Sequence, residues 1–488
     1  MPRPAKAEAP FPNAAFVFLP PRNVRFVGDE MVMCFVHSPR ASQEVILNGK
    51  TKIKAKRESN ATNSCINTAG EIFADGAMIE LISGSSGLRK PSLLLWNGRE
   101  ANVGPSVEHG GCIYEAPALA PSLYLATRFP SGCQDYSSAR NLFVTITDLF
   151  KRHLYLPERE SSLLGCFSIS TWLADQLPTA PTLMISGPDQ ELGIAVLRLL
   201  SCLCRHPLML AEVTPGGFRS LCTQLSLTLL LNQEELRPNM QRLFRASNHR
   251  GLHLAGNRGS VVNPYGPKAI FCGNDAALDI LDGGVIHISA APSQLQSLAL
   301  DEPVQNKIAN DLQPRLLMYR LKNSGKVPEP VDVSKFTFGT RPLARTFAAC
   351  FPEDLELARD AVQLLQPQDQ EVRGQRSRDV NCAIVEILWG YIHGPKQRGV
   401  KVDELGKDVN ALLRSRGEII QYSAEEIGWK LRSLNIKRHS DRAGRQVSVD
   451  RETSQNVHRL VRAYDLPCSH SAEASCPDCN AAKARLSK

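Results

Sequence analysis

The segment from Thr182 to Leu200, TLMISGPDQELGIAVLRLL, decides the expected fold of the chain. An apolar strand over 182–185 runs into a turn-prone loop, Gly187 to Gly193, and an apolar helix follows from Ile194 to Leu203. Strand, glycine-containing loop and helix in this order form the layout of a phosphate-binding loop, in which N–H groups at the helix start face the phosphates. The segment therefore predicts the shape of a nucleotide cradle.

The side chains that bind a metal–triphosphate complex are missing from this loop. Where a working loop carries Lys and then Ser or Thr after its last glycine, the chain has Ile194 and Ala195. Two loop carboxylates, Asp189 and Glu191, would repel a triphosphate, since unit charges about 4 Å apart interact by roughly 4 kcal/mol at an effective dielectric near 20. We therefore expect the shape of an ATPase without its hydrolysis.

Composition is typical of an ordinary globular protein. The 488 residues are 43% hydrophobic and 22% charged, and no apolar run is long enough for a membrane span. Because the first residues lack a secretory apolar segment and the 14 cysteines are scattered in mostly apolar contexts, we expect a cytoplasmic protein with reduced thiols and no membrane partner. A net charge of +8 permits a nucleic-acid partner without requiring one.

The spacing of apolar residues changes along the chain and indicates five parts. Short alternating runs predict strands, continuous apolar runs between helical patterns predict a parallel sheet flanked by helices, and a capping box at Ser423 and Glu426 opens a later helix. The expected order is a disordered tail, a β-rich domain, a P-loop-like α/β domain with a helical lid, a winged-helix domain and a Cys/His tail, over residues 1–20, 21–135, 139–395, 396–466 and 467–488.

Within the α/β part, individual elements are legible. Continuous apolar runs predict three further strands, at Leu225 to Asn232, Pro267 to Asn274 and Gly283 to Ala290. The polar stretch from Gln366 to Arg378 lacks an apolar face, so we expect it to be an exposed connection.

The order of these segments resembles the P-loop domain of primase- and helicase-like proteins carried by bacterial mobile elements. Members carry Gly-Lys-Thr at the end of a loop of the same length as GPDQELGIA, and a later Asp-Glu pair closes a strand. The runs RPNMQRLFRASNHRG, NRGSVVNPYGPKAIFCGN and GGVIHIS fall where the family has the helix after its third strand, its sensor strand and its fifth strand. A winged helix follows in the same order. The resemblance covers roughly two thirds of the chain.

The chain departs from this family at the residues that carry the chemistry. The family's Lys and Thr fall on Ile194 and Ala195, and its metal-organising Asp-Glu pair falls on Asn232 and Gln233. Amides carry no charge to organise magnesium and no basicity to activate water. A metal site shifted to Glu234 and Glu235 is the alternative. The degenerate nucleotide site then comprises Gly187, Pro188, Gly193, Ile194, Ala195, Asn232 and Gln233.

The expected winged helix carries a basic surplus. Between Lys396 and Asp465 there are 15 Lys and Arg against 10 Asp and Glu. The cations span the end of the expected recognition helix and the wing, where phosphate contacts are made in such domains. DNA binding is one interpretation, and packing or protein contact is the other. The candidate nucleic-acid-binding residues are Lys430, Arg432, Lys437, Arg438, Arg442 and Arg445.

The tail offers four metal-ligand side chains, Cys468, His470, Cys476 and Cys479. Cys476 and Cys479 have chelate spacing, and Cys468 with His470 would complete a structural zinc knuckle without an open catalytic position. Reduced, flexible thiols are the alternative.

These observations favour a cytoplasmic bacterial or mobile-element protein whose ATPase fold acts as a non-hydrolysing scaffold or DNA-binding factor. The expected partners are DNA, a protein partner or further copies of the chain. An active helicase- or primase-like motor with displaced catalytic residues is one alternative, and a protein-interaction regulator without DNA binding is another. We expect no catalytic residues, no ATP bound without hydrolysis, and structural zinc as the cofactor to test.

Overall fold

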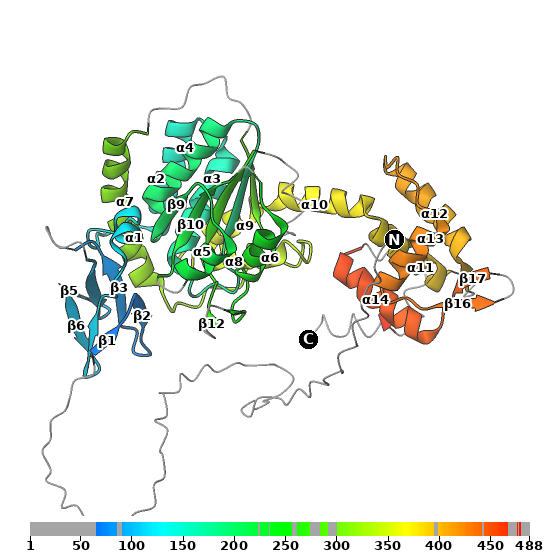
Figure 1. The fold of residues 1–488 in the computed structure, drawn as a ribbon, viewed down its shortest axis with the longest axis horizontal. Helices are drawn as coiled ribbons and strands as arrows, with labels where there is room; N and C mark the ends of the chain where they lie inside the picture. The colour runs from blue at the N-terminus through cyan, green and yellow to red at the C-terminus, as the bar shows by residue number, and fades with distance from the viewer. Residues whose placement is uncertain are drawn as a thin grey trace, which may run out of the picture. The chain divides into compact units, whose positions relative to one another are not determined.

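The computed structural model describes most of the chain after residue 64 (Figure 1). The described ranges are 65–84, 90–222, 225–233, 235–255, 261–273, 284–290, 300–394, 399–441, 444–466, 476 and 478–479. The expected disordered tail over 1–20 therefore lies outside the described residues, and so do Glu234, Arg442, Cys468 and His470.

A five-stranded parallel sheet forms the centre of the α/β part, which confirms the expected class of fold. Its strands are ordered β14-β8-β13-β10-β9, and every neighbouring pair is parallel. The three central strands, β8, β13 and β10, are almost wholly buried, as strands covered on both faces must be. Their bounds are β8 (Thr182–Ser186), β9 (Pro207–Leu210), β10 (Thr228–Asn232), β13 (Lys268–Cys272) and β14 (Ile286–Ser289).

Helices pack against the two faces of this sheet (Figure 1). Leu183 and Ile185 join one core with the larger group of helices, whereas Met184, between them, joins the opposite core with α5 and α6. The helices of the α/β part are α2 (Ala139–Leu154), α3 (Glu158–Leu173), α4 (Gln190–Leu203), α5 (Pro215–Leu221), α6 (Pro238–Ala246), α7 (Glu302–Asn323), α8 (Arg341–Ala349), α9 (Leu355–Gln363) and α10 (Gln366–Arg378). A two-stranded hairpin joins β11 (Leu254–Ala255) to β12 (Val261–Val262).

The expectation that residues 366–378 form an exposed connection is wrong, because they form α10. This helix has no apolar stripe, but two of its polar side chains are buried and bonded to distant elements. Gln368 accepts from the N–H of His287 at 3.1 Å, and Asp369 accepts from the N–H of Thr337 at 2.9 Å. Tertiary hydrogen bonds, which periodicity does not reveal, hold the helix in place.

An antiparallel sheet and a mixed sheet precede the α/β part. The four-stranded sheet β2-β3-β4-β5 lies beside the three-stranded sheet β1-β7-β6, in which β1 and β7 run parallel. Met78 belongs to one α/β core and Ile79 to the other, so the β-rich segment shares the hydrophobic core of the central sheet. The bounds are β1 (Cys65–Asn67), β2 (Gly70–Ile72), β3 (Met78–Ile82), β4 (Ser92–Trp96), β5 (Ala101–Gly104), β6 (Ser106–His109), β7 (Cys112–Glu115) and the short helix α1 (Pro121–Ala126).

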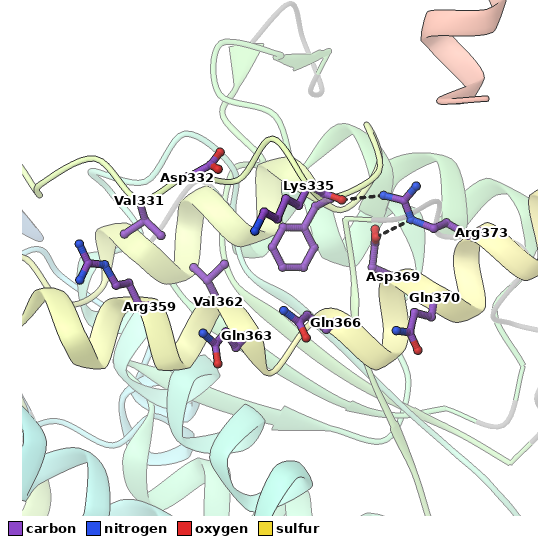
Figure 2. A pocket seen from close by; sticks show the side chains of 11 residues that line it. Val331, Asp332, Lys335, Arg359, Val362, Gln363, Gln366, Asp369, Gln370 and Arg373 are labelled. Atoms are coloured by element: carbon purple, nitrogen blue, oxygen red, sulfur yellow. Dashed lines mark hydrogen bonds and ion pairs between the residues drawn. The ribbon is translucent and has the colours of Figure 1, made fainter. Parts of the chain in front are cut away.

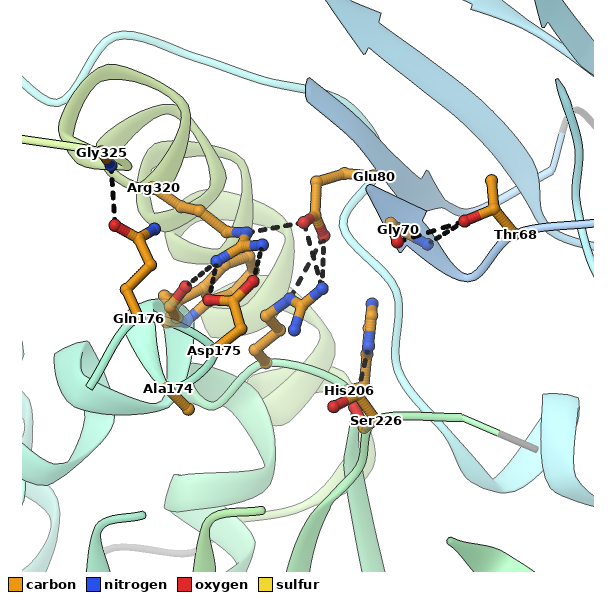
Figure 3. Close-up of polar contacts among 12 residues, drawn as sticks. Thr68, Gly70, Glu80, Ala174, Asp175, Gln176, His206, Ser226, Arg320 and Gly325 are labelled. Atoms are coloured by element: carbon orange, nitrogen blue, oxygen red, sulfur yellow. Dashed lines mark hydrogen bonds and ion pairs between the residues drawn. The ribbon is translucent and has the colours of Figure 1, made fainter. Parts of the chain in front are cut away.

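A buried ionic network ties β3 to the α/β part (Figure 3). Glu80, 1% exposed, accepts from Arg205 at 2.9 Å and from Arg320 at 2.6 Å. Arg320 also donates to the carboxylate of Asp175. The two cations and two anions balance, and breaking a buried pair of this kind is strongly destabilising.

The C-terminal module, residues 380–466 with Cys476 and Cys479, has its own hydrophobic core. Four helices enclose a three-stranded antiparallel sheet of order β15-β17-β16. The expected capping box at Ser423 and Glu426 is present at the start of α13. The elements are α11 (Val380–His393), β15 (Val400–Lys401), α12 (Val402–Ser415), α13 (Ala424–Ser433), β16 (Arg438–Asp441), β17 (Gly444–Val447) and α14 (Arg451–Tyr464).

Within the described residues, no helix combines the length and the apolarity that a membrane crossing requires. No disulfide joins the cysteines of the described segments.

Candidate functional site

The β8–α4 junction, residues 186–193, is tighter than the sequence predicts. Helix α4 begins at Gln190 rather than Ile194, so the loop expected over Gly187 to Gly193 shrinks to three residues. The side chain of Asp189 explains the early start, because it caps the helix by accepting from the N–H of Leu192 at 2.9 Å. The predicted loop is therefore wrong in its second half.

Several of the backbone N–H groups that could face a phosphate at this junction already have acceptors in the protein. The N–H groups of Gly187 and Asp189 donate to the carbonyls of Cys272 and Ala290, each at 3.4 Å. The N–H of Gly193 donates to the carbonyl of Asp189 at 3.0 Å. An anion would have to displace these bonds and also face the Asp189 carboxylate, so the junction is a poor anion site.

Packing explains both glycines of the junction. At Gly187, which has φ of +141°, a Cβ would lie 2.4 Å from the carbonyl oxygen of Ala290. At Gly193, a Cβ would lie 2.3 Å from the ring of Phe271. Each glycine is explained by the close approach of another part of the chain, Ala290 after β14 in one case and Phe271 of β13 in the other.

The remaining positions of the degenerate site are also committed to the fold. Ile194 and Ala195 lie on α4, and Ala195 is buried in the core. Asn232 ends β10. The N–H of Gln233 donates to the carbonyl of Phe271 at 3.1 Å and its side chain donates to the carbonyl of Glu235 at 3.0 Å.

A serine–histidine contact at the same edge of the sheet escaped the sequence reasoning. Ser186 Oγ lies 2.8 Å from Nε2 of His287, since β14 pairs with β8. The strand pairing could have suggested it, because both residues follow apolar runs. Ser186 is completely buried, however, and a nucleophile must reach its substrate. The contact therefore satisfies two polar groups within the core.

A pocket of about 580 Å³ lies between α9, α10 and the segment before α8 (Figure 2). Both acidic and basic side chains line this pocket. Hydrogen bonds from Thr337 hold the pKa of Asp369 below its usual range although burial raises it, and Arg373 donates to the same carboxylate. Lys335 and Arg359 are exposed at the rim. The lining includes no pairing of a nucleophile with a base, so it suggests no reaction.

The C-terminal module brings several of the predicted nucleic-acid-binding residues to one side of its hairpin. Arg438 pairs in register with Val447, which is buried against the helices, and Arg445 lies two residues before Val447 on the same face of the hairpin. The guanidinium of Arg438 lies against Gly428 of α13, where a Cβ would be 2.2 Å from its Nη1. Arg432 is exposed on α13.

The five predicted cations within the described residues are not equivalent. Lys437 is engaged in an exposed ion pair with Glu452 at 2.8 Å, and such pairs are weak. Within the described part of the module, Arg432 and Arg445 are exposed and have no carboxylate partner. Lys430 lies half-buried in the last turn of α13, where it also complements the helix dipole.

Two of the four predicted metal ligands come together with two histidines that the sequence reasoning did not select. His393, His458, Cys476 and Cys479 form the His2Cys2 cluster, in which one donor atom of each residue lies within 4.8 Å of the others. The group could hold a metal ion such as zinc. His393 ends α11 and His458 lies on α14, so only the tertiary fold brings them to the Cys476-x-x-Cys479 pair.

Comparison with known proteins gives little beyond distant similarity. No family model matches the chain, and no curated protein matches it. Two structures of the apo C-terminal region of NrS-1 each match 76% of this chain. The first is 11% identical with a TM-score of 0.33, and 97% of its chain is covered. The second is 12% identical with a TM-score of 0.30, and 96% of its chain is covered. A full-length MCM homolog from Methanopyrus kandleri is 11% identical with a TM-score of 0.32, over 60% of this chain and 78% of that one. Likeness at this level carries no argument about activity or ligand.

Proposed function

We propose that the chain is a nucleic-acid-associated protein that binds DNA through its C-terminal module and uses its α/β core as a non-hydrolysing scaffold. The observation that carries the proposal is the exposure of Arg432 and Arg445, which have no carboxylate partner in the described part of the module. Unpaired cations on one small domain favour polyanion binding, because each phosphate contact releases a counterion.

The order of elements supports the interpretation of this module as a winged helix. Helix α11, strand β15, helices α12 and α13 and the β16–β17 hairpin follow one another, and the three strands form one antiparallel sheet. In this interpretation α13 is the recognition helix and the hairpin is the wing. Arg432 then lies on the recognition helix and Arg445 on the wing, where each can reach a phosphate.

The charges favour contact with phosphates over contact with bases. The first turn of α13 carries Glu425 and Glu426, and the capping box occupies the carboxylate of Glu426. The cations lie instead in the last turn of α13 and on the hairpin. Phosphate contacts fix the position of a protein on DNA but read no sequence, so we expect weak sequence preference.

The non-hydrolysing role of the core follows from the β8–α4 junction. The N–H groups of Gly187, Asp189 and Gly193 are bonded within the protein. Ile194 and Ala195 provide neither the ammonium nor the hydroxyl of a working loop. We therefore expect no magnesium-dependent ATP turnover by the purified protein. Turnover abolished by Glu234→Gln would favour the motor with displaced residues instead.

DNA binding is tested by fluorescence anisotropy of the full chain with labelled duplex and single-stranded DNA across a salt series. The double variant Arg432→Ala/Arg445→Ala removes two phosphate contacts, so the slope of log Kobs against log[salt] on duplex DNA should become shallower by about 1.8. The matched control, Arg99→Ala/Arg152→Ala, removes the same charge from exposed positions outside the C-terminal module and should leave the slope unchanged. Equal slopes for the two double variants would overturn the proposal.

An exposed apolar group favours protein binding as the second candidate function. Ile419 is 93% exposed, and Ile420 and Trp429 are each 61% exposed, at the loop before α13 and on α13 itself. Single exposed apolar residues are common, but three near one helix favour a contact surface. Two results together would support this second function over the first. DNA affinity measured by anisotropy would not depend on salt, and a protein partner of the wild-type chain would no longer bind Ile419→Ser/Trp429→Ser.

A further inference from the structure

We infer that the His2Cys2 cluster is a structural zinc site that fastens the C-terminal tail to α11 and α14. The inference is independent of DNA binding, and it replaces the tail-only knuckle expected from Cys468 and His470. Three parts of the chain supply the four donors: the end of α11, the middle of α14 and the tail residues Cys476 and Cys479. His393 and Cys479 are 86 residues apart in sequence, so the convergence is a property of the fold.

Three nitrogen–sulfur separations in the cluster are close to those around a tetrahedral zinc ion. Nε2 of His458 lies 3.3 Å from Sγ of Cys476 and 3.4 Å from Sγ of Cys479, and Nε2 of His393 lies 3.7 Å from Sγ of Cys479. An ion about 2.3 Å from sulfur and about 2.0–2.1 Å from nitrogen would hold sulfur and nitrogen about 3.6 Å apart at the tetrahedral angle. The three distances bracket this value.

The histidines present the correct ring nitrogens to the site. Nδ1 of His393 lies 3.0 Å from the carbonyl of Trp389, and Nδ1 of His458 lies 2.7 Å from the carbonyl of Ser454. A carbonyl can only accept, so each Nδ1 carries the proton and each Nε2 has its lone pair directed at the thiols. Metal-binding histidines are oriented by this same second hydrogen bond.

Hydrogen bonding among the four side chains explains the arrangement less well than a metal does. A neutral imidazole whose Nδ1 donates has one acceptor lone pair at Nε2. Two thiols converge on that single atom of His458. A bound cation would instead use both sulfurs, as thiolates, and both nitrogens, and Cys2His2 with tetrahedral geometry is a preferred zinc donor set.

The surroundings suit a structural ion. His458 is 3% exposed, and the ring of Trp389 lies 3.9 Å from that of His393 and 4.6 Å from that of His458, measured between centroids. Four protein ligands leave no open coordination position, so the ion would support the fold and would not activate water. Its function would be to hold Cys476 and Cys479 against α11 and α14.

The test is the zinc content of the full chain purified without chelators, together with its thermal unfolding. We expect one zinc per chain and a Tm that falls by several degrees on chelation and recovers with added zinc. Replacement by Co2+ should give the absorption of a tetrahedral thiolate site. Less than about a tenth of an equivalent of metal, in protein that is folded by circular dichroism, would overturn the inference.

Variants separate this site from the tail-only knuckle. His393→Ala and His458→Ala should each lose the ion, whereas Cys468→Ser/His470→Ala should keep one equivalent. His393→Cys supplies another zinc ligand at the same position and should retain zinc. Its zinc content would show that the loss from His393→Ala is due to the missing ligand and not to misfolding. Retention of zinc by both His393→Ala and His458→Ala, or its loss from Cys468→Ser/His470→Ala alone, would contradict the assignment.

Discussion

The β8–α4 junction and the C-terminal module differ in what their polar groups do. At the junction, the N–H groups of Gly187, Asp189 and Gly193 all donate to protein carbonyls. In the C-terminal module, Arg432 and Arg445 extend into solvent, and the donor atoms of four metal-binding side chains converge within 4.8 Å. The junction has the order of elements of a ligand site, whereas the C-terminal module has side chains that are able to bind a ligand.

This difference shows that backbone layout and binding chemistry can be separated within one chain. A strand, a turn and a helix persist at the junction because they build the core of the sheet. Gly187 and Gly193 pack there against Ala290 and Phe271. Function should therefore be sought where polar groups are presented to solvent or converge on one point.

The largest expected effect is on stability, and it tests the buried ionic network around Glu80. Glu80→Ala would leave Arg205 and Arg320 buried with one carboxylate fewer, so we expect the free energy of unfolding to fall by about 3–5 kcal/mol. Urea unfolding of the full chain measures it, with Glu108→Ala on an exposed strand position as the control. A loss below about 1 kcal/mol would show that the network is not closed to solvent.

A second buried ionisable side chain gives a pH-dependent prediction. Lys268 is buried at the start of β13, and burial lowers its pKa from 10.5 to about 7. Between these values the unfolded chain binds a proton that the folded chain does not, so the free energy of unfolding rises with pH from 7 toward 10.5.

Lys268→Met should flatten this rise by an amount on the order of a few kcal/mol and should stabilise the protein at pH 7. Asn248 would still accept from Thr182, so the substitution leaves that acceptor bonded. Lys407→Met, at an exposed position of α12, is the matched control and should not change the slope. Denaturant unfolding at pH 7 and pH 9.5 measures both variants, and parallel slopes for Lys268→Met and wild type would refute the prediction.

Gly193 distinguishes packing from ligand binding at the junction itself. Gly193→Ala forces a Cβ against the Phe271 ring, so we expect a loss of about 1–3 kcal/mol. Gly374→Ala is the control, because that glycine lies in the exposed helix α10 with open space around it and alanine should stabilise it by about 0.5–1 kcal/mol. Thermal unfolding compares the two, and a Gly193→Ala protein as stable as wild type would mean that the junction is open.

The smallest effect is expected for ATP turnover, which should not change when two side chains of the junction are replaced. Ile194→Lys/Ala195→Thr supplies the two side chains of a working phosphate-binding loop, yet the N–H groups of Gly187, Asp189 and Gly193 remain bonded within the protein. We expect no magnesium-dependent release of phosphate from ATP above the wild-type background. A gain in turnover that needs both substitutions would show that side chains alone had been lost.

The fold could be predicted well where apolar runs carry it. The strands at β10, β13 and β14 lie within their predicted ranges, and β10 and β13 are buried almost throughout. The start of α4 could not be predicted, because it depends on Asp189 acting as a cap, and the sequence is equally compatible with a longer loop. Helix α10 was missed because its contacts, through Gln368 and Asp369, are tertiary.

The candidate site could be predicted only in part. Cys476 and Cys479 were found from their spacing, but no local signal links them to His393 and His458, which lie on two different helices. The absence of a Lys and a hydroxyl after Gly193 was visible in the sequence. The use of the backbone N–H groups by neighbouring carbonyls was not, since β13 and the end of β14 supply those acceptors from far along the chain.

Hydrogen–deuterium exchange of the full chain, with duplex DNA and separately with magnesium–ATP, tests the contrast between the two regions most directly. We expect DNA to slow exchange in α13 and the β16–β17 hairpin, and magnesium–ATP to leave residues 186–193 unchanged. Protection of the β8–α4 junction by the nucleotide, or unchanged exchange of α13 and the hairpin with saturating DNA, would contradict the account.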